Sequence, residues 1–368
     1  MTANTIKVAI AGLGNCASAL LQGLEYYKNI TGDEAYFHGL MNPDLGGYTP
    51  SDIEIVAAFD INEAKIGKDI SEAILAPPNC CAHIADVPPK EVMVKPGPVL
   101  DGCAEHMRSS FHCYDEARVK PVDVAAELKT ASAEILINFL PVGSAKASRA
   151  YAQAAIDAGC GFINCIPEFI VSEQVDGDED WVSKFTAKGL PCAGDDIKSQ
   201  VGATILHRVL GRLFLDRGVI VKSTYQLNIG GNTDFENMKM ESRLTTKRVS
   251  KTSAVSSVFP YEVQTRIGPS DYVPFLEDKK ICYIRVDGTT FGGLPLVCDA
   301  KLRVEDSPNS AGVVLDVIRC MKIALDRGVS GRLDSISSFS FKHPPQQPPS
   351  DVVAKKWVAE FIEGTRER

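Results

Sequence analysis

The stretch GDDIKSQVGATI, residues 194–205, carries more polar chemistry than a turn requires. It holds two acids, an ammonium, a hydroxyl and an amide, at Asp195, Asp196, Lys198, Ser199 and Gln200. The following residues read as the start of a helix, whose first backbone N–H groups lack partners and attract anions. One acid would suffice to cap this helix, and an ammonium is an unneeded charge at its positive end. The stretch is therefore either a capped turn or an anion site flanked by acid and base groups.

A second candidate site is the glycine-rich AGLGNCA, residues 11–17, which fits G-x-G-x-x-A between an apolar strand and a helix. Gly12 permits the tight turn, and Gly14 lets the backbone approach a pyrophosphate bound at the helix N-terminus. Asp60 ends the next strand and could accept a hydrogen bond from an adenosine ribose, which favours NAD over NADP. The separation of Gly14 and Asp60 exceeds the usual spacing of about 20 residues, so residues 28–52 would be an insertion. The alternatives are a plain strand-to-helix turn and a helix-capping acid.

Lysines supply the remaining candidates for chemistry. Lys247 and Lys251 lie in TTKRVSK, Lys280 follows another lysine, and Lys342 lies in FSFKHPP. A spacing of four places Lys247 and Lys251 on one face if the segment is helical, where like charges repel mildly. Most lysines are solvated surface residues, and the composition of these segments does not distinguish them from that background.

The elements that would position these groups alternate between apolar strands and amphipathic helices in the first half of the chain. Strands are expected at 7–12, 54–60, 134–141 and 161–167 and in LPCAGDD, and helices at about 17–27, 62–75 and 144–159. This order predicts an α/β fold, a Rossmann-like doubly wound parallel sheet. A Gly/Pro-rich loop at 38–52 and an excursion at about 77–120 would interrupt it.

After residue 199 the pattern changes to a helix at 199–218, followed by strand-like runs at 221–229, 282–288 and 296–304. It predicts an inserted α+β domain with a mainly antiparallel sheet. A long helix at 310–328, the alternating SISSFSF and a final helix come next, and Val353, Trp357 and Phe361 share one face of the last. The expected division is a dinucleotide-binding domain of residues 1–199 plus 308–368, and a second domain of residues 200–307.

The bulk composition narrows the functional class. The length of 368 residues suggests two domains, and the net charge of -8 argues against a nucleic-acid partner. The eleven cysteines form no CxxC pair and are odd in number, which predicts reduced thiols in a cytoplasmic protein. The first apolar run, IKVAIAGLG, is too short for a membrane span. No local ligand cluster indicates a metal site.

The chain resembles the myo-inositol-1-phosphate synthase family, and its actinobacterial branch in particular. The resemblance runs over nearly the whole sequence, through GLGNCAS, LLQGLEYY, AAFDI, LPVGS, YAQAAIDAG, GDDIKSQVGAT, NIGGNTDF, KRVSKT, IGPSDYV and EDSPNSAGV. It implies a Rossmann-like domain that binds NAD, a catalytic and oligomerising sheet domain, and a homotetramer.

The chemistry implied by the resemblance is the first step of inositol biosynthesis. Glucose 6-phosphate binds in its open form and is oxidised at C5, so that the neighbouring C6–H becomes acidic and an enolate forms. The enolate closes on the C1 aldehyde, and the ketone is reduced again to give 1D-myo-inositol 3-phosphate. NAD is thus needed without net redox change. The rival hypotheses are a net NAD-dependent sugar-phosphate dehydrogenase and a catalytically inactive NAD-sensing or scaffold protein, neither of which needs a lysine cluster.

The resemblance also implies roles for individual residues. The catalytic set comprises Lys247, Lys251, Lys280, Lys342, Asp196 and Asp306, in which the acids orient the ammonium groups. The cofactor set comprises Gly12, Gly14, Asn15, Cys16, Asp60, Phe139, Leu140, Tyr151, Asp196, Ser199, Asp234 and Lys247. The substrate set comprises Ser199, Gln200, Asn228, Asn232 and Lys251.

This chain departs from the pattern of the eukaryotic family members at the position of a further catalytic lysine. Eukaryotic members place it in a GDSK string after the strand corresponding to CYIRVDG, where this chain has FGGLP. Lys280, just before that strand, is the expected substitute, and Arg285 is the second choice.

Overall fold

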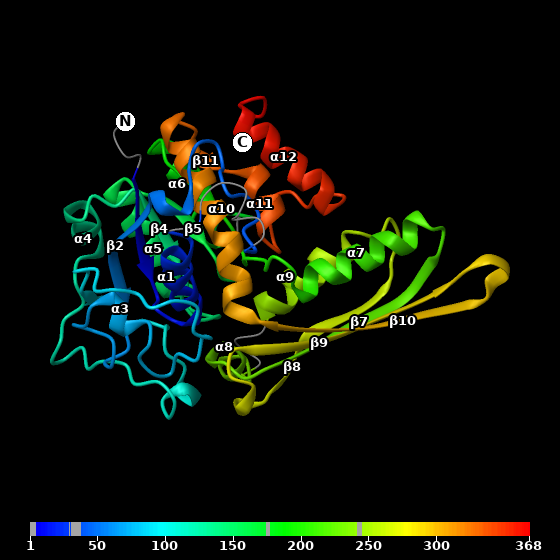
Figure 1. Ribbon diagram of the computed structural model, residues 1–368, viewed down its shortest axis with the longest axis horizontal. Coiled ribbons are helices and arrows are strands. Elements are labelled where there is room, and N and C mark those ends of the chain that lie inside the picture. The colour runs from blue at the N-terminus through cyan, green and yellow to red at the C-terminus, as the bar shows by residue number, and fades with distance from the viewer. Residues whose placement is uncertain (1–4, 29, 31–37, 174–176, 241–244) are drawn as a thin grey trace.

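The computed structural model describes residues 5–28, 30, 38–173, 177–240 and 245–368. The chain forms two sheets that lie side by side, and the long helix α10 (Asp306–Asp326) leads from the second back to the first (Figure 1). This arrangement confirms the predicted fold class.

The first sheet has seven parallel strands in the order β11-β6-β5-β4-β1-β2-β3. Their bounds are β1 Ile6–Ala11, β2 Ile53–Asp60, β3 Val94–Pro96, β4 Ile135–Asn138, β5 Gly161–Asn164, β6 Pro191–Ala193 and β11 Gly331–Arg332. The strand order reverses direction between β1 and β4. In an open parallel sheet this switch point, at the carboxyl ends of the strands, is where a dinucleotide binds.

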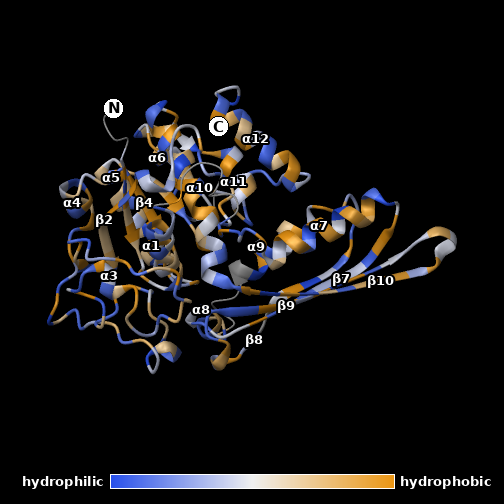
Figure 2. Ribbon diagram, viewed as in Figure 1, coloured by the Kyte–Doolittle hydropathy of each residue, from blue (hydrophilic) through white to orange (hydrophobic). Residues whose placement is uncertain are grey.

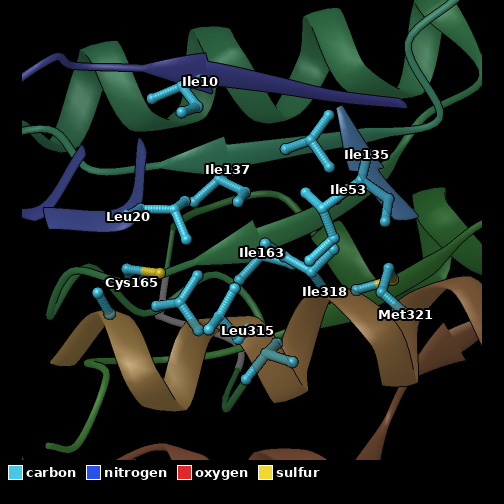
Figure 3. Packing of buried hydrophobic residues seen from close by; sticks show 14 of the residues in the cluster. Ile10, Leu20, Ile53, Ile135, Ile137, Ile163, Cys165, Leu315, Ile318 and Met321 are labelled. Atoms are coloured by element: carbon cyan, nitrogen blue, oxygen red, sulfur yellow. The ribbon is translucent and has the colours of Figure 1, made fainter. Parts of the chain in front are cut away.

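Helices cover both faces of this sheet. Helices α1 (Asn15–Tyr27) and α10 lie on one face, and α4 (Val124–Thr130), α5 (Ala145–Ala158) and α6 (Trp181–Ala187) contribute to the core on the other. Successive side chains of strand β1 point to opposite faces of the sheet. Ile10 packs in the core under α1 and α10, and Ala9 packs in the core under α4, α5 and α6. Figure 3 shows Leu315, Ile318 and Met321 of α10 packed against the sheet. Truncating a side chain buried like that of Ile318 to Ala costs roughly 2–5 kcal/mol.

The second sheet has the order β10-β9-β7-β8. Its strands are β7 Ile220–Gly230, β8 Gln264–Tyr272, β9 Lys279–Thr289 and β10 Pro295–Glu305. Strands β7, β9 and β10 are antiparallel, whereas β8 pairs parallel to β7. Helices α7 (Ala203–Asp216) and α9 (Thr245–Ser256) pack on one face, where Ile284 and Val286 are buried. Figure 2 shows hydrophobic residues at the free end of the β9–β10 hairpin. Phe291 lies in the 3-10 turn that joins the two strands and is exposed.

Shorter elements complete the fold. They are the helices α3 Ile70–Ala73, α8 Thr233–Asn237, α11 Asp334–Ser340 and α12 Asp351–Glu363, and the 3-10 turns Pro50–Asp52, Glu105–Met107, Pro274–Leu276 and Phe291–Gly293. The alternating segment SISSFSF lies mostly in α11. Phe361 is fully buried in α12, and Val353 and Trp357 on the same face are half-buried. Within the described part of the chain, no helix is long and apolar enough to cross a membrane.

Two predicted helix boundaries are wrong. The helix expected at 62–75 is reduced to the single turn of α3, because Gly67 has a φ of +77° and Asp69 caps a new start. The helix expected from residue 199 begins at Ala203, with Gly202 as its N-cap. Ser199 and Gln200 therefore lie in the turn before the helix and not in its first turn.

Candidate functional site

A cavity lies at the carboxyl ends of β1, β2 and β4 and extends to the start of β9. Most of the residues predicted from the sequence line it together: Gly12, Gly14, Asn15, Cys16, Asp60, Phe139, Leu140, Tyr151, Asp196, Ser199, Asn232, Asp234, Lys251, Lys280, Asp306 and Lys342. Gly12, Gly14 and Asp60 belong to one part of this lining, and the lysines Lys251, Lys280 and Lys342 with their acids belong to another. We call these the glycine-turn end and the lysine end.

The glycine-turn end is built from backbone. Gly12 has a φ of +90°, and a Cβ there would lie 2.9 Å from the carbonyl oxygen of Phe139, so only glycine fits. Gly14 is the N-cap of α1 and supplies no capping side chain, and a Cβ at Gly14 would meet nothing within 4 Å. The first N–H groups of α1 thus border open space in the cavity, which suits a bound anion.

Asp60 braces this turn. Its Oδ2 accepts a hydrogen bond from the N–H of Leu13 at 2.7 Å, and its Oδ1 accepts from Ile61 and Asn62 at 2.7 and 2.8 Å. A carboxylate has about four acceptor positions, so Asp60 retains capacity for a ribose hydroxyl.

Lys65 also lines the cavity. The pattern NEAKIGK is typical of a helix surface and does not indicate a buried site lysine. Its side chain is 2% exposed, and its Nζ donates to the carbonyl of Leu13 at 2.7 Å and to Oδ1 of Asn79 at 2.9 Å. Burial lowers the pKa of Lys65, and the nearby Asp60 carboxylate opposes that effect. Lys65 and Asp60 therefore hold the same turn residue, Leu13. Lys65 binds its carbonyl, and Asp60 binds its N–H.

Tyr151 offers a polar atom to a ligand. The side chain is 1% exposed, and its Oη has no hydrogen-bond partner among the residues that the structure describes. A Cβ at Gly97 would lie 2.0 Å from this Oη, so a larger residue there would displace the ring. Burial raises the pKa of Tyr151 and keeps the phenol protonated. An unpaired buried hydroxyl is costly, and a ligand in the cavity would relieve that cost.

At the lysine end, Lys342 is held by the corner at residues 194–205. Its Nζ donates to Oδ1 of Asp196 at 2.9 Å and to the carbonyl of Ile197. The second oxygen of Asp196 accepts from the hydroxyl of Ser250 at 2.7 Å. Ser250 precedes Lys251, which is 3% exposed and reaches the cavity from α9. Asp196 thereby links the segment after α11 to helix α9, which packs on the second sheet.

A second ion pair comes from the start of β9. Nζ of Lys280 lies 3.0 and 3.3 Å from the two carboxylate oxygens of Asp306, the first residue of α10. Arg285 instead pairs with Asp287 at 3.0 Å and does not line the cavity. Of the two candidates for the missing lysine, the structure brings only Lys280 to the site.

Asp278 is a further buried acid that the sequence did not reveal, because EDKK reads as a charged surface. It accepts hydrogen bonds from Nδ2 of Asn232 at 2.9 Å and from Oγ and N of Ser307 at 2.8 and 3.1 Å. Burial, reinforced by the charge of Asp306, raises the pKa of Asp278 to about 6. The other amide atom of Asn232, Oδ1, caps α8.

Three predicted site residues remain. Two of them, Gln200 and Asn228, do not line the cavity, and the side chain of the third is not described. Gln200 donates to the carbonyl of Gly39 at 2.7 Å and lines a neighbouring groove. Asn228 is buried in β7 and donates to the carbonyl of Gly268 at 2.9 Å. The side chain of Lys247 lies outside the described part of the chain. In that described part, no group of three or more His, Cys, Asp or Glu residues is arranged to hold a metal ion.

Comparison with known proteins finds relatives along the whole chain. The sequence model of the family described as Myo-inositol-1-phosphate synthase matches residues 202–307. The chain is 51% identical to an inositol-3-phosphate synthase of Corynebacterium glutamicum, covering 99% of this chain and 100% of that protein. It is 48% identical to an inositol-3-phosphate synthase of Mycolicibacterium smegmatis, over 98% and 99% of the two chains. The crystal structure of Ari2 superposes with a TM-score of 0.78 at 32% identity, over 98% of this chain and 99% of that one.

Proposed function

This chain belongs to the myo-inositol-1-phosphate synthase family, and we propose that it cyclises D-glucose 6-phosphate to 1D-myo-inositol 3-phosphate with NAD. The relatives of high identity are named inositol-3-phosphate synthases and match over nearly their full length. The observation that carries the proposal is the cavity itself, in which a glycine turn and two lysine–carboxylate pairs face the same space.

The glycine-turn end fits NAD. The uncapped N-terminus of α1 would bind the pyrophosphate, Asp60 an adenosine ribose, and the unpaired Oη of Tyr151 a further polar group. By family resemblance, Asn15, Cys16, Phe139, Leu140 and Asp234 would flank the same molecule. When bound, NAD supplies a hydride acceptor at C5 that later gives the hydride back, so the sugar undergoes no net oxidation.

The lysine end fits the sugar phosphate. The enolate and aldol oxyanions carry negative charge on oxygen, and fixed ammonium groups in a site shielded from water stabilise such charge strongly. Lys342 and Lys280 approach from different segments and are each oriented by a carboxylate, Asp196 and Asp306. A lysine in its neutral form would accept the C6 proton as the enolate forms. It would then deliver that proton to the C1 alkoxide that ring closure creates, because the new C6–C1 bond takes the proton's place on C6. Lys247 is assigned to the same group by resemblance.

The phosphate and hydroxyl groups of the open sugar need further polar partners. Ser199, Asn232 and Lys251 line the cavity and are the contacts that we propose. Gln200 and Asn228 belong to the same set by resemblance, and their present hydrogen bonds to main-chain carbonyls would have to be exchanged for bonds to the substrate.

We further propose the division into residues 1–199 plus 308–368 and residues 200–307, and assembly into a homotetramer. The face of the second sheet opposite α7 and α9 supports assembly. Leu227, Tyr283 and Val297 are exposed there. Phe291 at the hairpin end is 97% exposed. Apolar surface of this kind is typical of a contact between subunits.

The test is phosphorus NMR of the protein with NAD and glucose 6-phosphate, read together with the absorbance of reduced nicotinamide. We expect the resonance of an inositol phosphate to appear with no net rise in that absorbance. Steady accumulation of reduced nicotinamide without a cyclised product would support the dehydrogenase instead.

A further inference from the structure

A cluster of two buried cations and one partly buried carboxylate lies next to the lysine end without lining the cavity. It consists of Lys198, Arg208 and Asp351, which we call the buried triad. The carboxylate of Asp351 bridges the two cations, with Oδ1 at 3.4 Å from Nζ of Lys198 and Oδ2 at 3.0 Å from Nε of Arg208. The two cations are 2% and 1% exposed. The triad explains why the corner at 194–205 contains an ammonium.

Lys198 binds the end of the helix that precedes Lys342. Its Nζ donates to the carbonyls of Ser338 and Phe339, both at 3.1 Å, in the last turn of α11. Its backbone N–H donates to the carbonyl of Ser340 at 2.8 Å. A cation at a helix C-terminus satisfies carbonyls that have no partner within the helix. Lys198 thus fixes where α11 ends and where the strand-like residues that carry Lys342 begin.

Arg208 binds the helix that carries Lys251. It extends from α7 and donates through Nη1 to the carbonyl of Ala254 and to Oγ of Ser257, the latter at 3.0 Å. Through Nη2 it donates to the carbonyl of Pro348 at 3.2 Å, just before α12. A guanidinium holds several acceptors in one plane, so these bonds fix orientation as well as distance. Ala254 lies about one turn after Lys251 in α9.

We propose that Asp351 is a positioning residue for the cyclisation, because it holds together the two cations that fix the helices next to Lys251 and Lys342. The inference rests on the proposed function of those lysines. Asp351 is the first residue of α12, so the C-terminal helix would contribute to the active site without touching the substrate. Its loss would leave Lys198 and Arg208 as adjacent like charges without their shared counter-ion. The helix ends that the two cations hold would then be free to shift.

The electrostatics agree with this geometry. Burial is the main cause that lowers the pKa of Lys198 to about 8. Asp351 opposes this effect, and Arg208 adds to it. For Asp351 burial alone would raise the pKa, but the attraction of Lys198 and Arg208 prevails and lowers it. The carboxylate is therefore charged at neutral pH and bound to both cations.

The test compares Asp351→Asn with Asp351→Glu, which restores the charge, and with Lys356→Ala, which removes an exposed ion pair on the same helix. Displacing catalytic groups by about 1 Å costs on the order of 100-fold in rate. We expect Asp351→Asn to lower kcat about 10- to 100-fold, with Asp351→Glu recovering part of it and Lys356→Ala unchanged. The dissociation constant of NAD, measured by calorimetry, should stay nearly the same.

Amide hydrogen exchange gives a readout that does not depend on activity. Asp351→Asn should speed exchange at the C-terminal ends of α9 and α11 but leave α1 as in the wild type. Lys198→Met, which keeps the pair between Asp351 and Arg208, should affect α11 only. Wild-type kcat and exchange in Asp351→Asn, or faster exchange throughout the chain, would overturn the proposal. If the wild type did not cyclise the sugar, the proposed function would be rejected. The exchange measurement would still test the structural role of the triad, because it does not depend on activity.

Discussion

The two ends of the cavity are built in opposite ways. At the glycine-turn end the binding groups are backbone atoms and one carboxylate, supplied by neighbouring pieces of the chain around β1 and β2. At the lysine end they are charged side chains from distant segments, with Asp196, Lys251, Lys280, Asp306 and Lys342 brought together by folding. The difference teaches that a turn suited to binding an anion through its backbone can be recognised from a local sequence motif. A cluster of paired charges from distant segments can be recognised only in the folded structure.

The energetic requirements of the two ends differ in the same sense. Backbone N–H groups at a helix start attract an anion without burying a formal charge. Ammonium groups withdrawn from water lose hydration and need compensating partners. Lys342 and Lys280 each lie beside a carboxylate, whereas Lys65 at the glycine-turn end is held by a carbonyl and an amide oxygen. Changes at the lysine end should therefore affect the chemistry, and changes at the glycine turn should affect cofactor binding.

The largest effect is expected for Lys342→Ala. Loss of this ammonium removes charge stabilisation worth about 10²- to 10³-fold in kcat and a possible proton carrier as well, so cyclisation should fall below detection by phosphorus NMR. The affinity for NAD, measured by calorimetry, should be nearly intact. Lys355→Ala, an exposed residue of α12, is the control. Loss of NAD binding in Lys342→Ala would contradict the claim that the lysine end serves the chemistry and the glycine-turn end serves cofactor binding.

The next largest effect is expected for Lys280, and Arg285 on the same strand serves as the comparison. Lys280→Ala should lower kcat by about 10²-fold, because Lys280 pairs with Asp306 in the cavity. Arg285→Ala should leave kcat per folded protein nearly unchanged, since its partners Asp287 and Asp299 lie on the second sheet. Steady-state kinetics of the two variants checks this order. The reverse order would assign the missing lysine's role to Arg285.

A smaller effect is expected at the other end. Gly12→Ala places a Cβ 2.9 Å from the Phe139 carbonyl at a φ of +90°, a strain of about 1–3 kcal/mol. The dissociation constant of NAD should rise about 10- to 100-fold, by calorimetry. Gly47→Ala has the same backbone strain at φ +91° without a clash, and it should bind NAD normally. Equal binding by both variants would show that the turn does not hold the cofactor.

The smallest effect concerns Asp278 and the pH dependence of stability. Its pKa is raised from 3.8 to about 6, so the folded state holds a proton that the unfolded state has already released. The contribution of this group to the free energy of unfolding is full below pH 3.8 and is lost as the pH rises through about 6. In denaturant titrations, Asp278→Asn should remove that decline. If the free energy of unfolding of Asp278→Asn declined with pH as in the wild type, a group other than Asp278 would be responsible.

The contrast also explains how far the sequence could be interpreted. The parallel sheet, Gly12, Gly14 and the position of Asp60 follow from local patterns, because hydrophobic periodicity and turn glycines act over a few residues. Lys65 and Asp278 gave no signal, since the sequence around each is typical of a solvated surface. The choice between Lys280 and Arg285 depends on which face of β9 each occupies. Gln200 was assigned to a helix start that folding placed at Ala203.

The most direct test of the whole account uses glucose 6-phosphate deuterated at C5, with excess unlabelled reduced nicotinamide in solution. If one cavity holds the cofactor and the lysines around the same sugar, the deuterium should return to the carbon it left. Mass spectrometry should then find the label fully retained in the inositol phosphate. Deuterium in the free reduced cofactor, or an unlabelled product, would contradict a single enclosed reaction.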